Sequence, residues 1–238
     1  MSPELLTRLL ALEGVPSALA SARDGIDAML RDRGLRRTTP ETTAESLLRG
    51  AHASAVLEGS SSSLDDLRAG TGDDVAAASV RLSAQLLSQA PVVTRSPLQA
   101  FARLHTLAGA GCVPDEALGR PRDADAAARL RDLGPVVTAD APALLVAAVV
   151  HAELLAAEPF ASHNGLVARA AERLVLVARG LDAKSLVVPE AGHLALRPAY
   201  EARWRGWRDG GRAGQHAWVL HAADAYVAAA EASPLHDV

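Results

Sequence analysis

The fold is decided by residues 151–169, which read HAELLAAEPFASHNGLVAR. The first half of this stretch continues an apolar segment with helical spacing, and Pro159 ends it because proline cannot continue a helix. A short loop over residues 160–163 follows. Asn164 and Gly165 then open a second apolar segment of helical spacing. These features predict two helices joined by a tight turn.

The start of the second helix has the features of an anion-binding seat. The first N–H groups of a helix have no partner within the helix, and the helix dipole places a partial positive charge there. The Asn164–Gly165 turn therefore suits a phosphate group. Arg169 lies about one helical turn further on, where a guanidinium can clamp the same group. The alternative interpretation is a helical hairpin whose turn is purely structural.

Helical spacing of apolar residues extends along nearly the whole chain, and proline, glycine and capping residues mark the helix ends. The expected helices cover residues 3–12, 16–33, 40–57, 63–67, 73–90, 96–108, 123–133, 140–157, 164–179, 195–208 and 215–231. A small strand is expected at Val136–Thr138, within a small β-hairpin near residues 113–138. No internal repeat or long linker divides the chain. The predicted fold class is a single all-α domain.

The composition excludes several classes of protein. The 238 residues carry a net charge of −4, which argues against a nucleic-acid-binding protein. The apolar run Ala141–Ala152 falls short of the roughly 20 residues that cross a bilayer. Glu4 and Arg8 interrupt the apolar N-terminus, which is therefore unlike a secretory signal. We expect a cytoplasmic protein with one reduced cysteine, Cys112, and without nucleic acid or a membrane as partners; the oligomeric state stays open.

Common catalytic motifs are also missing from the sequence. It contains no P-loop, G-x-x-x-x-G-K-[ST], and its only lysine, Lys184, lies in the unrelated context LDAKSL. H-E-x-x-H, C-x-x-C and G-x-S-x-G are absent as well. The simplest forms of a P-loop NTPase, a zinc protease and an α/β-hydrolase are therefore excluded.

Two short patterns, in the order expected, resemble motifs of the Fic (Fido) family. Residues 158–169 keep Glu-Pro-Phe, Asn-Gly and Arg at the spacing of the Fic motif H-P-F-x-[D/E]-G-N-G-R-x-x-R. About 100 residues upstream, Ser54-Ala-Val-Leu-Glu58-Gly59 is similar to the inhibitory-helix pattern [S/T]-x-x-x-E-[G/N]. Each pattern alone is loose, so the resemblance depends on both occurring together. Tyr200 and Trp218 in the C-terminal part add to it.

The resemblance divides the chain into three parts. Residues 1–39 form N-terminal helices, residues 40–231 form one compact Fic-like helical domain, and residues 232–238 form a tail. The inhibitory helix covers about residues 41–58 of that domain. The implied architecture is an all-α Fic-like helical bundle with a small β-hairpin flap.

The resemblance also implies functions for individual residues. Fic proteins transfer AMP from ATP to a hydroxyl side chain of a target protein, with the motif histidine as general base and the motif acid holding Mg²⁺. In this chain, the phosphate-binding positions are His163, Asn164, Gly165 and Arg169. Ser54, Glu58 and Gly59 take the inhibitory positions, at which the glutamate pairs with the last arginine and blocks productive ATP binding.

Four positions depart from the Fic motif. Glu158 stands in place of the histidine, Ser162 in place of the acid, His163 in place of the first glycine and Leu166 in place of the first arginine. Loss of a positioned general base costs roughly 10²–10⁴ in rate. A carboxylate with a pKa near about 4.3 is a weaker base than imidazole, and without the Mg²⁺ ligand the charge of the transferred phosphoryl group is not neutralised. These losses predict that ordinary AMP transfer is absent.

Three hypotheses follow for the function. The first is a degenerate Fic-fold protein that binds a nucleotide such as ATP, another phosphate ligand or a protein partner, without a clear need for Mg²⁺ because Ser162 replaces the acid. The second is an enzyme of altered chemistry that uses Glu158 as base or ligand. The third is a purely structural helical interaction module.

Two further expectations concern the core. His151 lies on an apolar helix and is expected to be a hydrogen-bonded core histidine; its spacing from Glu158 and His163 is not that of a known metal site. Trp204 and Trp207 lie three residues apart, on one face of a helix, and are expected to pack into the core.

Overall fold

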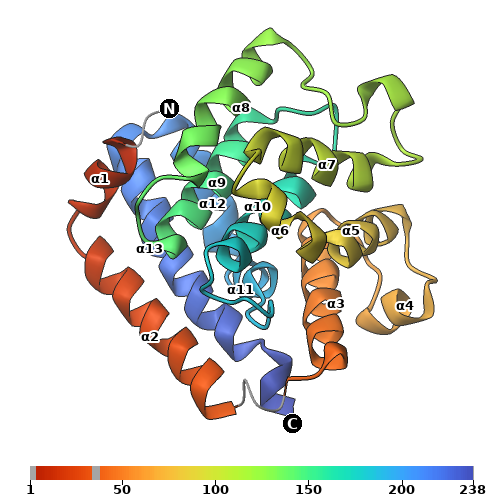
Figure 1. The fold of residues 1–238 in the computed structure, drawn as a ribbon, viewed down its shortest axis with the longest axis horizontal. Coiled ribbons are helices and arrows are strands. Elements are labelled where there is room, and N and C mark those ends of the chain that lie inside the picture. Colours follow the sequence, from red (N-terminus) through yellow and green to blue (C-terminus); the bar gives the residue numbers. More distant parts are fainter. Residues whose placement is uncertain (1–3, 34–37, 238) are drawn as a thin grey trace.

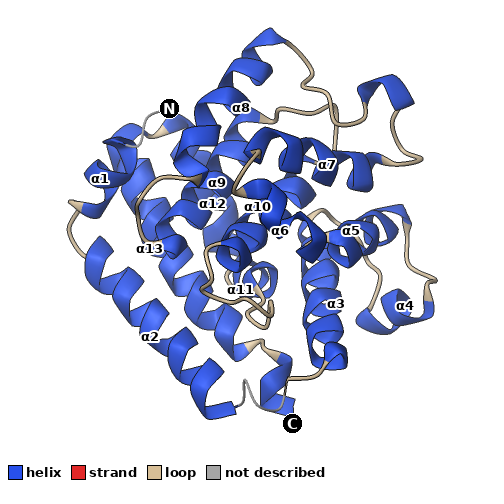
Figure 2. Ribbon diagram, in the orientation of Figure 1, coloured by secondary structure: helices blue, strands red, loops and turns tan. Residues whose placement is uncertain are grey.

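A computed structural model describes residues 4–33 and 38–237 of the chain. In this part of the chain every regular element is helical, and Figure 2 shows helices and loops without a strand. The predicted all-α class is therefore confirmed. The α-helices are α1 Glu4–Leu10, α2 Val15–Arg33, α3 Pro40–Leu57, α4 Leu64–Ala69, α5 Asp74–Gln85, α6 Ala90–Val93, α7 Pro97–Gly109, α8 Ala124–Val137, α9 Ala143–Ala157, α10 Asn164–Ala178, α11 Pro189–Ala195, α12 Arg197–Asp209 and α13 Gly211–Glu231; 3₁₀ turns cover Leu87–Gln89, Asp115–Ala117 and Pro234–Asp237.

The predicted pair of helices at 140–157 and 164–179 forms the centre of the molecule as α9 and α10 (Figure 1). α9 packs against α8, α10, α12 and α13, and these neighbours bury most of its apolar circumference. Trp218 links α13 to α9, because its indole Nε1 donates a hydrogen bond to the carbonyl of Ala148 at 2.9 Å. The turn between α9 and α10 therefore connects the two most buried helices of the fold.

α3 is held against this centre by a buried arginine of α10. The Arg173 guanidinium donates to the Ser46 hydroxyl of α3 at 2.6 Å and to the Glu190 carboxylate of α11 at 3.1 Å. Gly50 lies where α3 passes the Arg173 side chain, and a β-carbon there would collide with the guanidinium and with Glu190. At its start, Thr39 caps α3 by accepting a hydrogen bond from the Thr42 amide at 3.3 Å. The Arg173 contacts fix α3 relative to α10 and α11.

The helices before the predicted boundary at residue 40 also contact this unit. α1 and α2 pack against α13, and α2 runs beside it in Figure 1. Parts of the predicted segments 1–39 and 232–238 fall on residues 1–3, 34–37 and 238, which lie outside the described residues. None of the described helices is by itself long and apolar enough to cross a membrane; the bent pair α1–α2 reaches that length and composition only together.

The predicted strand and hairpin are wrong. Val136 and Val137 end α8, and the segment between α7 and α8 is loop with one 3₁₀ turn. Helix prevails because Leu130, Leu133 and Val137 recur at helical spacing and bury one stripe of α8. A two-residue valine run is too short to outweigh that stripe.

Some helix boundaries also differ from expectation. The predicted helix at 73–90 stops at Gln85 and continues as a 3₁₀ turn and the short helix α6, with Pro91 inside that helix instead of beyond it. α11, which begins at Pro189, was not expected. α13 starts four residues before the predicted position, at Gly211, which has a positive φ of 56°.

Candidate functional site

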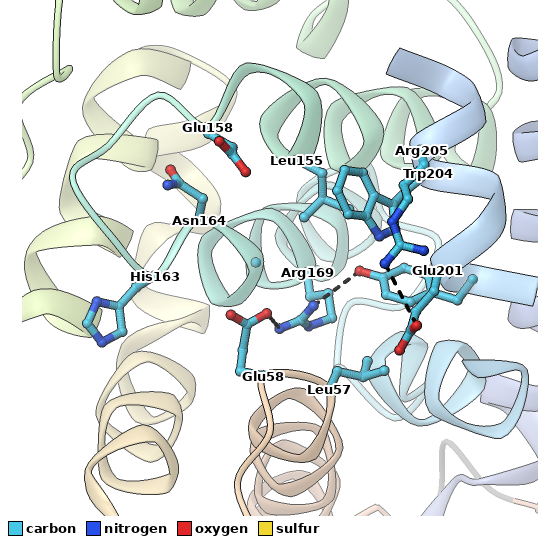
Figure 3. Close-up of a pocket in the computed structure, with 12 residues that line it drawn as sticks. Leu57, Glu58, Leu155, Glu158, His163, Asn164, Arg169, Glu201, Trp204 and Arg205 are labelled. Atoms are coloured by element: carbon cyan, nitrogen blue, oxygen red, sulfur yellow. Dashed lines mark hydrogen bonds and ion pairs between the residues drawn. The ribbon is translucent and has the colours of Figure 1, made fainter. Parts of the chain in front are cut away.

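A pocket of about 410 Å³ opens where α3 ends, where α10 begins and along one side of α12 (Figure 3). It includes much of the turn between α9 and α10, for which an anion seat was predicted. Its lining consists of Leu57, Glu58, Leu155, Glu158, His163, Asn164, Gly165, Arg169, Tyr200, Glu201, Trp204 and Arg205.

An ion pair between the two motifs closes the inner end of the pocket. Arg169 Nη2 lies 2.7 Å from Glu58 Oε1, so the contact that the motifs predict is present. The guanidinium also donates to the Ser54 hydroxyl at 2.8 Å, to the Ser54 carbonyl at 3.2 Å and to the Tyr200 hydroxyl at 3.1 Å. Only 1% of Arg169 is exposed. The pair therefore joins the end of α3 to the first turns of α10.

The Glu58 carboxylate lies at the N-terminus of α10, the position at which the sequence predicted an anion-binding seat. It lies against Gly165 in the first turn of α10, where a β-carbon would collide with Glu58 Oε1. Gly59 makes this placement possible: its φ of 94° is accessible to glycine, and it ends α3 immediately after Glu58. A carboxylate near the free N–H groups of a helix start is stabilised there. Glu58 is thus a built-in anion at the start of α10.

The loop before α10 is fixed by the Asn164 side chain. Its Oδ1 accepts from the Phe160 amide at 2.9 Å, and its Nδ2 donates to the Phe160 carbonyl at 3.0 Å. The Phe160 ring is buried and stacks on His105 of α7, with ring centroids 4.4 Å apart. Asn164 therefore shapes the turn, in addition to lining the pocket.

Glu158 and His163 both adopt left-handed backbone conformations. Glu158 has a φ of 42° and ends α9, and His163 has a φ of 56° immediately before α10. The His163 conformation explains why the Fic motif has glycine there, since a residue with a β-carbon pays about 1 kcal/mol or more for it. The His163 ring lies 2.6 Å from the Ser162 hydroxyl, and burial lowers the pKa of His163 although Glu58 opposes this.

The Glu158 carboxylate points to the outer part of the pocket, and 54% of its side chain is exposed. Its nearest cation is Arg122, at 3.8 Å, in the loop that leads into α8. The Arg122 amide also donates to the Pro159 carbonyl at 2.8 Å. The loop at 119–122, where the resemblance implies a flap, therefore contacts the motif turn without forming a hairpin.

Behind Arg169 lies a buried polar cluster that the sequence indicated only in part. As expected, His151 is a hydrogen-bonded core histidine, with Nδ1 2.8 Å from Glu172 and Nε2 3.0 Å from the Tyr200 hydroxyl. Glu172 and His193 were not expected as members; the signal was a glutamate inside the apolar helix α10. Burial lowers the pKa of His151 to about 4. Although burial raises the pKa of Glu172, the two histidines lower it well below its usual value.

The two tryptophans of α12 have different surroundings. Trp207 is buried as predicted, and its Nε1 donates to Glu153 at 2.9 Å. Trp204 is only half-buried and lines the pocket, so its placement in the core was only partly correct. The guanidinium groups of Arg205 and Arg208 lie 5.4 and 5.5 Å from the centre of its ring. The pocket wall thus combines an aromatic face with cations.

Comparison with known proteins identifies the fold. The chain superposes on a Fic family protein from Desulfovibrio desulfuricans G20 with a TM-score of 0.73 and 18% identity, over 90% of this chain and 73% of that one. The chain has a Fic fold. A Fic-1 fragment from C. elegans gives a TM-score of 0.69 at 16% identity, over 91% of this chain and 71% of that one. No family model and no curated protein matches the sequence.

In this fold, the two segments that resemble Fic motifs lie beside the same pocket. The segment that resembles the Fic motif forms the turn at the pocket, and the segment that resembles the inhibitory motif forms the end of α3 beside it. At this level of identity the likeness concerns the fold, so the chemistry of the pocket has to be argued from its own residues.

Proposed function

We propose that the pocket of this Fic-fold protein binds the phosphate groups of a nucleotide, with ATP as the first candidate, or of another phosphate ligand, and that Glu58 blocks it. The observation that carries the proposal is the Glu58 carboxylate, which lies against Gly165 at the start of α10 and 2.7 Å from Arg169. A phosphate at this position would accept hydrogen bonds from the free N–H groups of the helix N-terminus and from the guanidinium.

The charges in the pocket support a blocked state. Three carboxylates, of Glu58, Glu158 and Glu201, face two guanidinium groups, of Arg169 and Arg205. This balance disfavours a polyanion. When Glu58 leaves, two carboxylates face two guanidinium groups, and the partial positive charge of the α10 N-terminus is uncovered. Departure of Glu58 is therefore the step that turns the pocket into an anion site.

The same pocket does not support ordinary AMP transfer. The only carboxylate in the turn from 158 to 164 is Glu158, which faces Arg122, and the Ser162 hydroxyl is engaged with His163. These groups do not fit Mg²⁺, whose usual protein ligands in such sites are carboxylates. A general base of the histidine type is also missing from the position that Glu158 occupies. Binding of a ligand or a protein partner is thus the function we infer.

Calorimetry tests this function. ATP, ADP and GTP are each titrated, with and without Mg²⁺, into the unmodified chain and into Glu58→Gly. We expect Glu58→Gly to bind at least one nucleotide roughly 10-fold more tightly than the unmodified chain, which is about 1.4 kcal/mol, with little dependence on Mg²⁺.

The matched control is the double variant Glu58→Gly/Arg169→Ala, which has the same opening without the guanidinium and is expected to lose the gain. If Glu58→Gly binds none of the three nucleotides, the nucleotide proposal is ruled out. Equal binding by the double variant would rule out the role of Arg169.

A second candidate is an altered chemistry at Glu158. Its carboxylate is exposed at the same pocket and paired only loosely, at 3.8 Å, with Arg122. Incubation with labelled nucleotides and a cell lysate tests it: labelling that disappears in Glu158→Ala supports the chemistry, and labelling that persists assigns it to another group. If neither binding nor labelling is found, and Asn164→Ala and Arg169→Ala change only stability, the pocket is structural.

A further inference from the structure

Arg169 has a second anchor that does not belong to α3. Its Nη1 lies 3.1 Å from the hydroxyl of Tyr200 on α12. That hydroxyl lies 3.0 Å from Nε2 of His151 on α9, and Nδ1 of His151 lies 2.8 Å from the Glu172 carboxylate on α10. These four side chains are at most 4% exposed, so water does not compete for their hydrogen bonds. They form a continuous polar chain from the pocket into the core.

The direction of each hydrogen bond in this chain follows from the donors. A guanidinium only donates, so the Tyr200 oxygen accepts from Arg169, and its single proton is left for His151 Nε2. His151 must then carry its proton on Nδ1 and donate it to Glu172. Tyr226 donates to the same carboxylate at 2.8 Å. With His151 neutral and Glu172 ionised, the Tyr200 proton and the His151 proton each have one acceptor.

The anchors of Arg169 therefore divide into two groups. Ser54 and Glu58 both belong to α3 or its end: departure of the Glu58 side chain leaves the Ser54 contacts in place, and all of them are lost if the end of α3 moves. Tyr200 is fixed by His151 and Glu172, which belong to the central helices. Glu172 is fully buried and paired with His151 and His193.

We propose that Tyr200, oriented by His151 and Glu172, is a positioning residue that keeps the Arg169 guanidinium aimed into the pocket after Glu58 has left. The proposal rests on the proposed phosphate-binding function of the pocket. Tyr200 acts through Arg169, and its hydroxyl is needed both as acceptor for the guanidinium and as donor to His151. The guanidinium is thus pre-oriented for its ligand, which reduces the cost of ordering it on binding.

The same cluster has a composition that also suits a metal ion. His151, Glu172 and His193 offer ligand atoms within 4.8 Å of one another. In the chain of hydrogen bonds, however, His151 Nδ1 carries a proton directed at Glu172, and His193 Nε2 lies 3.1 Å from the same carboxylate, so neither nitrogen offers a lone pair to a cation. The chain of hydrogen bonds requires the His151 proton on Nδ1, whereas a metal ion bound between His151, Glu172 and His193 would require that nitrogen to be deprotonated.

Nitrogen-15 NMR of the histidine rings in the unmodified chain therefore tests the chain of hydrogen bonds without any substitution. We expect neutral His151 with its proton on Nδ1 at pH 7 and no change on addition of Zn²⁺. A proton on Nε2, or a shift of the His151 signals on addition of Zn²⁺, would overturn the proposal.

The positioning role is tested in the opened pocket by comparing Glu58→Gly with Glu58→Gly/Tyr200→Phe. NMR of the arginine side chain reports rotation of the Arg169 guanidinium, and this readout needs no ligand. We expect slow rotation in Glu58→Gly and faster rotation in the double variant, in which only the two contacts with Ser54 remain. We also expect about a 10-fold weaker affinity for inorganic pyrophosphate by calorimetry, since a hydrogen bond to a charged group is lost.

Tyr226→Phe in the Glu58→Gly background is the matched control, because it removes another buried hydroxyl from Glu172 without touching Arg169. We expect its pyrophosphate affinity to stay within twofold of Glu58→Gly. Rotation of Arg169 as slow in the Tyr200 variant as in Glu58→Gly, or an equal loss of affinity in the Tyr226 variant, would overturn the positioning role. If Glu58→Gly itself binds no pyrophosphate, the proposed function fails, and the rotation measurement still decides the role of Tyr200.

Discussion

The ion pair between Glu58 and Arg169 is asymmetric at the scale of its two residues. Arg169 is almost completely buried and has four hydrogen-bonding contacts, whereas 32% of the Glu58 side chain is exposed and its carboxylate sits at the end of a flexible stem. The partly exposed carboxylate can move into water, whereas the guanidinium cannot leave without losing all four contacts; the departure of Glu58 does cost the ion pair of a buried charge. Glu58 is therefore the partner that can leave.

Gly165→Ala provides a test of this asymmetry. The added methyl group collides with Glu58 Oε1, which is the mobile end of a side chain, so we expect the carboxylate to swing out. Loss of the ion pair lowers the free energy of unfolding, and alanine, which is favoured over glycine in a helix by up to about 1 kcal/mol, offsets part of this, so we expect a net fall of about 2 kcal/mol or less.

The same methyl group fills the anion position, so Gly165→Ala should gain no nucleotide affinity, in contrast to Glu58→Gly. Urea unfolding and calorimetry measure both quantities. A fall of several kcal/mol in the unfolding free energy would show that Glu58 is held rigidly, contrary to this account.

The sequence predicted the residues of the site better than their surroundings. A helix start and an arginine one turn later are local features and pointed to Gly165 and Arg169, whereas Glu58 came only from the resemblance to the Fic inhibitory-helix pattern. Tyr200 and Trp204 were not predicted to line the pocket. They reach it from α12 through tertiary packing, for which one sequence contains no direct signal.

At the scale of helices, the approach of α3 to α10 depends on a small residue. Gly50 faces the Arg173 guanidinium and Glu190, which are both buried and hydrogen-bonded. A side chain at this position would separate the two helices. The position of Glu58 at the end of α3 depends on this contact.

We therefore expect Gly50→Ala to lower the free energy of unfolding by about 2 kcal/mol or more, since overpacking a filled core typically costs about 1–3 kcal/mol and here a buried ion pair must also move. The matched control is Gly25→Ala on α2, where a β-carbon meets nothing within 4 Å. That variant should be stabilised by up to about 1 kcal/mol. Equal effects in urea unfolding would contradict a close contact at Gly50.

Helices whose sequences contain a clear N-terminal capping residue were predicted well, whereas predictions from short apolar runs were wrong. Thr39 before Pro40 and Ser63 before α4 cap the helices that they predict. Val136 and Val137 indicated a strand from β-branched residues alone, and the apolar stripe of α8 prevailed. α11 was missed because its seven residues are too few to show a period.

At the scale of the whole molecule, the core contains buried ionisable side chains, His151 and Glu172 among them, and their hydrogen bonds require one protonation state. His151 is fully buried and neutral between Tyr200 and Glu172, and burial lowers its pKa to about 4 from an ordinary value of 6.5. Below pH 6.5 the unfolded chain therefore takes up a proton that the folded chain does not. Stability from this group is complete above about pH 7 and is lost as the pH falls toward 4.

We expect the free energy of unfolding to fall by about 2 kcal/mol between pH 7 and pH 5 from His151 alone. Urea unfolding at both pH values measures the total dependence, and His151→Gln should show a shallower one. An unchanged pH dependence in that variant would contradict a buried neutral His151.

The all-α class followed from composition and periodicity, because helices are local structures. The buried cluster that joins α9, α10, α11 and α12 did not, because His151, Glu172, His193 and Tyr200 meet only through the fold. An isolated histidine or glutamate in an apolar helix signals that a partner exists, without saying where it lies.

The most direct test of the account is a crystal structure of Glu58→Gly with inorganic pyrophosphate. We expect one phosphate group at the start of α10, in contact with the backbone N–H groups near Gly165 and with the Arg169 guanidinium, which keeps its hydrogen bond to Tyr200. A pyrophosphate bound elsewhere, or an Arg169 turned out of the pocket, would contradict the claim that Glu58 occupies a phosphate site.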